Sequence, residues 1–148
     1  MLTPPMHYSD NGLALTEGFE SCRLSAYQDS KGVWTNGWGH TGPDVYEGCP
    51  DIDQPTAQFN LKHDTARAEL AVNQGCNVPV TQNEFDAMVD FTFNVGWTAF
   101  MNSTLLKRLN ALDNAGAATE FQAWVYSGGK MLNGLKRRRD AEARLFLA

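Results

Sequence analysis

The chain has 148 residues, of which 43% are hydrophobic and 20% are charged, a balance that excludes a disordered or fibrous protein. A chain of this length buries roughly 70% of its unfolded surface, enough for one domain with its own core. Its net charge of −5 does not favour a nucleic-acid partner. Because no stretch approaches the ~18 apolar residues of a membrane span, we expect a soluble protein without its own export signal.

The first predicted elements are a short helix and a small sheet. Residues 10–21, DNGLALTEGFES, open with capping residues and continue with helical spacing, which predicts a helix that ends near Glu20. The β-prone segments RLSAY and GVWTNG follow, with a weaker third segment at 44–46, and turn signals separate them. We expect these segments to form a small antiparallel sheet.

Helical patterns occupy the rest of the chain. The chain after Asp53, with Pro55 in the first turn, predicts one long helix that ends at Gly75. Thr81–Glu84 is a capping box that opens a nearly apolar helix. Further helical segments follow at 104–112, 115–125 and 135–146, with a loop at 127–130. The pattern predicts an α+β fold, in which a cleft lies where the β region meets the helices.

The three cysteines show no metal-binding or redox spacing. Cys22, Cys49 and Cys76 are far apart, and their odd number does not suit a full disulfide framework. We expect free thiols in a reducing compartment. The alternative is one disulfide between Cys49 and Cys76, with Cys22 unpaired.

The segment ESCRLSAYQDSKGVWTNGWGHT carries the candidate chemistry. Glu20 and Asp29 are separated by a strand that must turn back after the helix, so the two carboxyl groups are expected to converge. Cleavage of a glycosidic bond needs one acid and one second carboxylate that face each other across the sugar. Thr35 lies on the next strand and can hold a water molecule with its hydroxyl. Glu17 is a rival for the acid, because the spacing alone does not choose between it and Glu20.

Aromatic and polar side chains in the same segment suggest substrate contacts. Trp34 and Trp38 can stack on sugar rings, and glycines at 37 and 39 allow backbone to approach a ligand. His40 is expected to tie the sheet to a helix by hydrogen bonds, and it is also a candidate for substrate binding.

The spacing E-x2-RL-x-AY-x-D-x5-T-x-G-x-GHT resembles that of the T4-like phage lysozymes, glycoside hydrolase family 24. The blocks PVTQNEFDAMVDFTFNVG, FMNSTLLKRLN and AATEFQAWVYSGGKMLNGLKRRRDAEARLF also resemble the helical lobe of that family. The resemblance covers about residues 12–147 and selects Glu20 over Glu17. It implies one lysozyme-like domain over 1–148, in which a β lobe at about 22–54 is joined by a long helix to a helical lobe formed by about 75–148 and the N-terminal helix.

The resemblance implies an endolysin that hydrolyses the β-1,4 bond between N-acetylmuramic acid and N-acetylglucosamine in bacterial peptidoglycan. Glu20 would be the general acid, Asp29 the second carboxylate and Thr35 the residue that positions water. No metal or other cofactor is implied. The resemblance, together with the residues themselves, suggests four substrate-binding candidates, Trp34, His40, Ser103 and Asn133.

The resemblance also implies a monomer, made in the host cytoplasm, that reaches the periplasm with the help of a separate holin. Residues 101–148 carry 8 basic and 4 acidic side chains, so one expectation is that the basic helix around Lys136–Arg139 attracts an anionic wall or outer membrane. The alternative is that some of these arginines are buried and serve stability.

Three other functions remain as alternatives. A wall-binding module without activity would lack one of the two carboxylates, yet both Glu20 and Asp29 are present. A peptidase or amidase would call for a zinc set or a Cys/His pair, and the three scattered histidines do not provide one. A lytic transglycosylase needs only one catalytic acid, so Asp29 and Thr35 favour hydrolysis.

Overall fold

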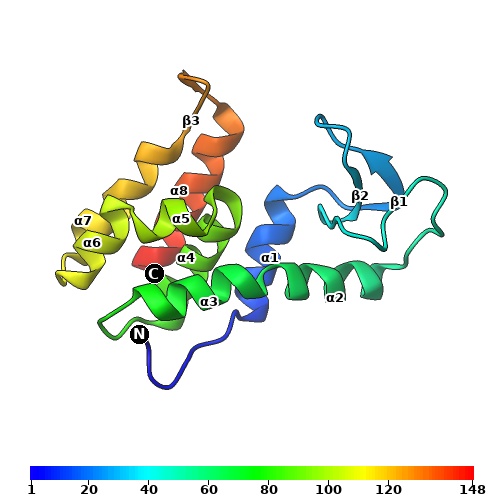
Figure 1. The fold of residues 1–148 in the computed structure, drawn as a ribbon. Coiled ribbons are helices and arrows are strands. Elements are labelled where there is room, and N and C mark those ends of the chain that lie inside the picture. The colour runs from blue at the N-terminus through cyan, green and yellow to red at the C-terminus, as the bar shows by residue number, and fades with distance from the viewer. The chain divides into compact units, whose positions relative to one another are not determined.

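The computed structural model describes all 148 residues and contains eight α-helices, one 3₁₀ turn and two β-hairpins (Figure 1). The elements in chain order are α1 Asp10–Phe19, β1 Arg23–Gln28, β2 Trp34–Gly37, α2 Gln54–Asp64, α3 Ala66–Gly75, α4 Gln82–Val95, α5 Trp97–Met101, α6 Thr104–Asn110, α7 Asn114–Glu120, η1 Phe121–Trp124, β3 Tyr126–Ser127, β4 Lys130–Met131 and α8 Asn133–Leu147. This mixture confirms the α+β prediction. None of the helices is both long enough and apolar enough to cross a membrane.

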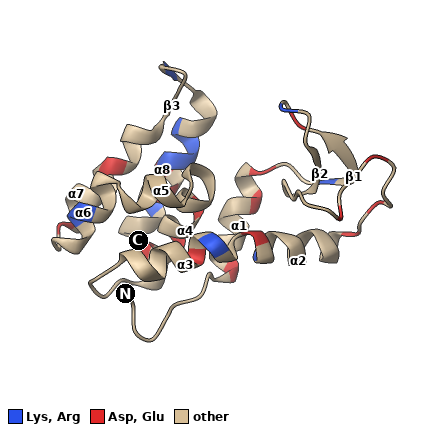
Figure 2. Ribbon diagram, viewed as in Figure 1, with Lys and Arg blue, Asp and Glu red and all other residues tan.

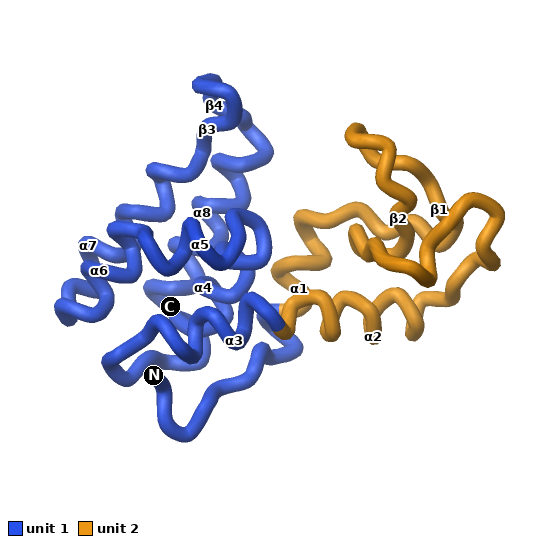
Figure 3. The backbone as a smooth tube through the Cα atoms, in the orientation of Figure 1, with its two compact units in different colours: residues 1–12, 67–148 blue, residues 13–66 orange.

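The chain divides into two compact units (Figure 3). Residues 1–12 and 67–148 form one unit, called here the helical unit, and residues 13–66 form the other, called the β unit. Helix α1 begins in the helical unit and ends in the β unit. The whole segment from Glu20 to Thr41 that carries the candidate chemistry lies in the β unit.

Two strands, rather than three, make the sheet of the β unit. Strands β1 and β2 are antiparallel, with Tyr27 opposite Thr35 and an irregular register nearer Arg23. The expected third strand at 44–46 is wrong, because residues 41–53 form successive turns in which Val45 N donates to Gly42 O (3.0 Å) and Cys49 N donates to Tyr46 O (3.1 Å). Glycines with positive φ at 42 and 48 allow these turns.

The long helix predicted between Asp53 and Gly75 is instead two helices, α2 and α3, that are separated at Thr65. Helix α2 starts directly after Asp53, with Pro55 in its first turn as predicted, and the Asp53 side chain caps it by accepting a hydrogen bond from Thr56 N. The Thr65 hydroxyl donates to Lys62 O (3.0 Å), and a threonine side chain bonded to the preceding turn competes with regular helix geometry. The predicted apolar positions Leu61, Ala68 and Val72 are all buried.

Helix α4 lies at the centre of the helical unit. The predicted capping box is present, because Thr81 and Glu84 bond each other's backbone N–H groups. Every residue from Glu84 to Thr92 is buried, as expected of a helix that is surrounded by others. An edge-to-face cluster extends this core, in which the ring centroids of Phe91 and Phe121 are 5.4 Å apart.

A cluster of buried charges joins α8 to α4. The Arg138 guanidinium donates to both oxygens of Asp90, at 3.0 and 2.8 Å. Arg139 and Glu142 are fully buried beside this pair, with 3.2 Å between Arg139 Nε and Glu142 Oε2. Burial, followed by the Asp90 carboxyl, raises the pKa of Glu142 well above its usual range. Arg138 and Arg139 of the basic segment are therefore buried in ion pairs within the helical unit. Figure 2 shows further basic residues along α8.

The loop predicted at 127–130 is a hairpin, in which Tyr126 pairs with Met131 and Ser127 with Lys130. Its two turn residues, Gly128 and Gly129, have φ of 58° and 78°. Two central residues with positive φ are typical of the tight turn that suits the twist of a hairpin. The Gly-Gly pair was therefore the sequence signal for this element.

Candidate active site

Glu20 lies immediately after the last residue of α1. Its backbone N donates to Thr16 O (2.9 Å), which continues the helical pattern by one residue, and its side chain is half-buried. A Cβ added to Gly39 would lie 4.0 Å from Glu20 Oε2, and Gly39 has a φ of +86°. The end of α1 thus places the Glu20 carboxyl beside the backbone that follows β2, where a glycine keeps the approach open.

Asp29 is held by the turn between β1 and β2. Its Oδ1 accepts hydrogen bonds from Lys31 N (2.8 Å) and Val33 N (2.9 Å), while its own backbone N donates to Val33 O. Both bonds of the side chain use Oδ1, which leaves Oδ2 available as an acceptor. The turn therefore fixes the direction of the carboxylate without using all of its capacity.

Thr35 is buried on β2, with 4% of its surface exposed. Its Oγ1 donates a hydrogen bond to Val33 O (2.9 Å). The hydroxyl hydrogen is therefore used, and the oxygen lone pairs remain to accept a hydrogen bond. Thr35 stands opposite Tyr27, and Asp29 follows Tyr27 by two residues. Because side chains alternate along a strand, Asp29 and Thr35 share one face of the hairpin.

His40 connects two parts of the β unit. Its Nδ1 lies 2.7 Å from Asp64 Oδ2 at the end of α2, and its Nε2 lies 2.9 Å from Asp44 Oδ2. Burial opposes protonation, but the hydrogen bonds to Asp64 and Asp44 outweigh it and raise the pKa of His40. Both ring nitrogens are therefore occupied by contacts within the unit, and a substrate-binding role for His40 stays a prediction.

Replacing His40 by asparagine should lower the free energy of unfolding by about 1–3 kcal/mol near pH 5, because hydrogen bonds to charged groups contribute that much. The folded-state pKa is raised, so this stabilisation is complete below the ordinary histidine pKa and is lost as pH rises through the folded value. Urea unfolding at pH 5 and pH 9 would measure it. An equal loss at both pH values would contradict the pairing.

The remaining substrate-binding candidates are separated between the units. Trp34 is half-buried at the start of β2 in the β unit, whereas Ser103 and Asn133 belong to the helical unit. The Ser103 hydroxyl is buried, donates to Phe100 O (2.7 Å) and accepts from Leu106 N (3.1 Å), so it caps α6. Asn133 is exposed at the start of α8. Contact of these residues with substrate stays a prediction.

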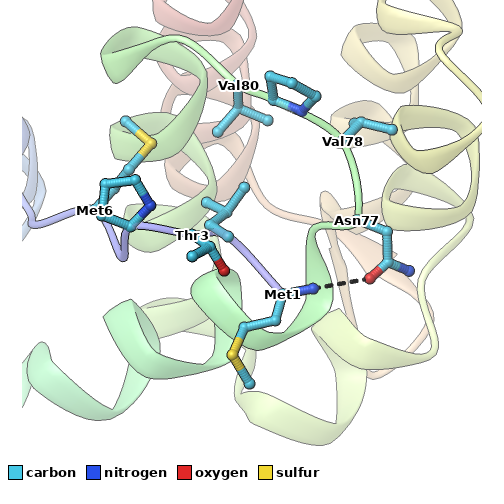
Figure 4. A pocket seen from close by; sticks show the side chains of 9 residues that line it. Met1, Thr3, Met6, Asn77, Val78 and Val80 are labelled. Atoms are coloured by element: carbon cyan, nitrogen blue, oxygen red, sulfur yellow. Dashed lines mark hydrogen bonds between the residues drawn. The ribbon is translucent and has the colours of Figure 1, made fainter.

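Two features of the structure lay beyond the sequence reasoning. Asp64 as a partner of His40 was missed, because the two residues are 24 positions apart; Asp44, four positions from His40, offered the only local signal. A cavity of about 410 Å³ in the helical unit was also missed, and it lies between the N-terminal segment and residues 77–80 (Figure 4). There the Met1 amino group donates to Asn77 Oδ1 (3.0 Å).

The cysteines and the possible metal ligands of the chain form no second candidate site. Cys22, Cys49 and Cys76 all carry free thiols, and burial raises the pKa of Cys76 to about 12, which makes it a poor nucleophile. No three His, Cys, Asp or Glu side chains are grouped so that they could hold a metal ion.

Comparison with known proteins identifies the family of the chain. The sequence matches the family described as phage lysozyme over residues 17–142. The chain belongs to the phage lysozyme family. Members of this family are glycoside hydrolases, and this lysozyme is accordingly an endolysin that lyses the bacterial cell wall.

Individual relatives of this lysozyme match over nearly their whole length. The endolysin of Acyrthosiphon pisum secondary endosymbiont phage 1 is 44% identical over 95% of this chain and 98% of its own. That of Salmonella phage P22 is 37% identical over 97% and 99%. The solved endolysin of Escherichia coli O157:H7 phage FAHEc1 superposes with a TM-score of 0.85 at 40% identity, over 96% of this chain and 94% of that one. The lysozyme fold is therefore confirmed.

Proposed function

We propose that this lysozyme hydrolyses the β-1,4 bond between N-acetylmuramic acid and N-acetylglucosamine, with Glu20 as the general acid and with a water held by Asp29 and Thr35. The observation that carries the proposal is the pair of acceptors on the hairpin. Asp29 Oδ1 is used by the turn and the Thr35 hydroxyl hydrogen is used by Val33 O. Asp29 Oδ2 and the Thr35 lone pairs are left to accept the two hydrogens of one water molecule.

The reaction then follows from these roles. Glu20 transfers its proton to the glycosidic oxygen as the bond from that oxygen to C1 breaks. The held water attacks C1 from the opposite face of the ring, and its proton passes to Asp29. Because a water molecule, not the carboxylate, forms the new bond, the configuration at C1 inverts. The products are two shorter glycan strands, one with a new reducing end.

Analysis of the released muropeptides tests the reaction type. The proposal expects a reducing N-acetylmuramic acid for every bond cleaved, since water is added across the bond. If the products carried 1,6-anhydro-muramic ends instead, the enzyme would be a lytic transglycosylase and the water site would have no role.

The proposed water site leads to a further prediction for Thr35. Thr35→Val removes the oxygen that accepts from water and should lower kcat by about 10²-fold, as expected when a reactant is misplaced. Thr35→Ser keeps the oxygen and should be milder. Thr35 also bonds Val33 O, so thermal unfolding of both variants must accompany the rate measurements. Equal rates for the serine and valine variants would contradict the role.

The route to the wall is also a proposal. We infer that the enzyme is monomeric, is made in the host cytoplasm and reaches peptidoglycan in the periplasm after a separate holin has permeabilised the inner membrane; the resemblance of the chain to phage endolysins supports this. Expression of the chain alone in Escherichia coli should leave the culture turbid until chloroform or a holin is added. Prompt lysis without either would contradict the requirement.

A further inference from the structure

The β unit contains a pocket whose lining includes none of the proposed catalytic residues. Five residues from α1, the segment after β2 and the start of α2 line this cavity of about 220 Å³: Glu17, Trp38, Gln54, Pro55 and Gln58. Glu20, Asp29 and Thr35 are not among them. The pocket therefore needs an explanation of its own.

Two polar side chains of this pocket are hydrogen-bonded to each other. Gln58 Nε2 donates to Glu17 Oε1 (3.3 Å), which links α2 to α1. Burial raises the pKa of the Cys22 thiol, and the nearby Gln54 side chain partly opposes this rise. Fixed amide and carboxylate groups bind with less loss of side-chain entropy than mobile ones.

These side chains retain hydrogen-bonding capacity. The bond between Gln58 and Glu17 leaves Gln58 Oε1 and Glu17 Oε2 as acceptors. The indole N–H of Trp38 is buried and has no surface open to the pocket, so the donors left for a ligand are amide N–H groups of Gln54 and Gln58. A ligand rich in hydroxyl and acetamido groups, which both donate and accept, matches this mixture.

Apolar surface adjoins the polar groups. Phe59 is 72% exposed and directly follows Gln58 on α2. Pro55 precedes Phe59 by four residues, so the two side chains are neighbours on one side of the helix. Together with Trp38, they provide aromatic and aliphatic surface for the C–H faces of sugar rings.

The negative charge of the β unit favours neutral wall components over anionic ones. Residues 13–66 contain three basic and eight acidic side chains, and acidic residues are spread over this part of the chain in Figure 2. A carboxylate ligand, such as the lactyl group of N-acetylmuramic acid or a peptide side chain of the wall, would be repelled beside Glu17. A neutral N-acetylated sugar meets no such penalty.

We propose that this pocket is a second glycan-binding site that takes a neutral N-acetylglucosamine residue, apart from the bond that is cleaved. The choice of a glycan as ligand rests on the proposed function. Binding at two sites would keep the enzyme on an insoluble polymer between cleavage events.

Amide-resolved NMR titration of the full chain with the β-1,4-linked disaccharide of N-acetylglucosamine tests the proposal. The Trp38 indole N–H and the Gln54 and Gln58 side-chain amides should shift with a saturable dependence on concentration. Phe59→Ala and Gln58→Ala should each weaken binding at these resonances by about tenfold, the scale of one good contact. Lys62→Ala, an exposed change on the same helix, is the matched control and should not weaken it.

Two results would overturn the proposal that this pocket binds a glycan. One is the absence of any shift at Trp38 and the two glutamines; the other is shifts of unchanged affinity in a folded Phe59→Ala variant. Free N-acetylmuramic acid should shift these resonances less, and equal shifts would contradict the charge argument. Product release from peptidoglycan, measured on the same preparation, separates the two proposals. Product without shifts refutes only the pocket, whereas shifts without product refute only the hydrolase mechanism.

Discussion

Replacing Glu20 by glutamine is expected to lower the rate of peptidoglycan cleavage by about 10²–10⁴-fold, the usual contribution of a general acid. The amide keeps the shape of the side chain but has no acidic proton for the leaving oxygen. Loss of turbidity of purified walls measures the rate, and circular dichroism with thermal unfolding confirms that the fold is intact.

The matched control for this variant is Glu47→Gln, because Glu47 is an exposed acid of the same unit with no assigned role. It should cleave walls at nearly the wild-type rate. If Glu20→Gln retained the activity, the acid would have to be sought elsewhere, first at Glu17, one helical turn earlier on α1.

Replacing Arg138 by alanine is expected to destabilise the protein by about 3–5 kcal/mol, because removal of one partner leaves a buried charge uncompensated. Asp90, which Arg138 holds through two hydrogen bonds, is fully buried, as is Glu142. Urea unfolding measures the loss. A change below about 0.5 kcal/mol, typical of surface sites, would contradict the importance of the cluster.

Arg137 is the matched control, since it is the preceding residue and is exposed. Arg137→Glu should change the free energy of unfolding little. If exposed cations on α8 attract an anionic wall, the same variant should cleave whole walls more slowly at low salt and approach the wild-type rate at high salt. The attraction expected from the whole basic segment is thus limited to its exposed members, because Arg138 and Arg139 are buried.

Local patterns predicted much of the fold. The capping box at Thr81, the apolar face of the following helix and the end of α1 near Glu20 all depend on neighbours in sequence, and the structure confirms them. The candidate site could be predicted for the same reason, since Glu20, Asp29 and Thr35 lie within one short segment. The choice of Glu20 over Glu17, however, came from the family resemblance, not from spacing.

Features that depend on distant residues were not predictable in this way. The pairing of His40 with Asp64 and of Arg138 with Asp90 joins residues 24 and 48 positions apart, and nothing in the local pattern marks the partner. The break at Thr65, where the hydroxyl donates to Lys62 O, lies within a sequence that otherwise favours a continuous helix. Which arginines of α8 are buried was also left open, because their burial depends on packing against Asp90 and Glu142.

The central claim is that water held by Asp29 and Thr35, and not a carboxylate, attacks the sugar. Proton NMR of the reaction during its first minutes, before the anomers equilibrate, tests it most directly. The account predicts that the new N-acetylmuramic acid reducing end appears first as the α-anomer, since one displacement inverts the β bond. Initial appearance of the β-anomer would show a double displacement through a glycosyl-enzyme, and would contradict the roles given to Asp29 and Thr35.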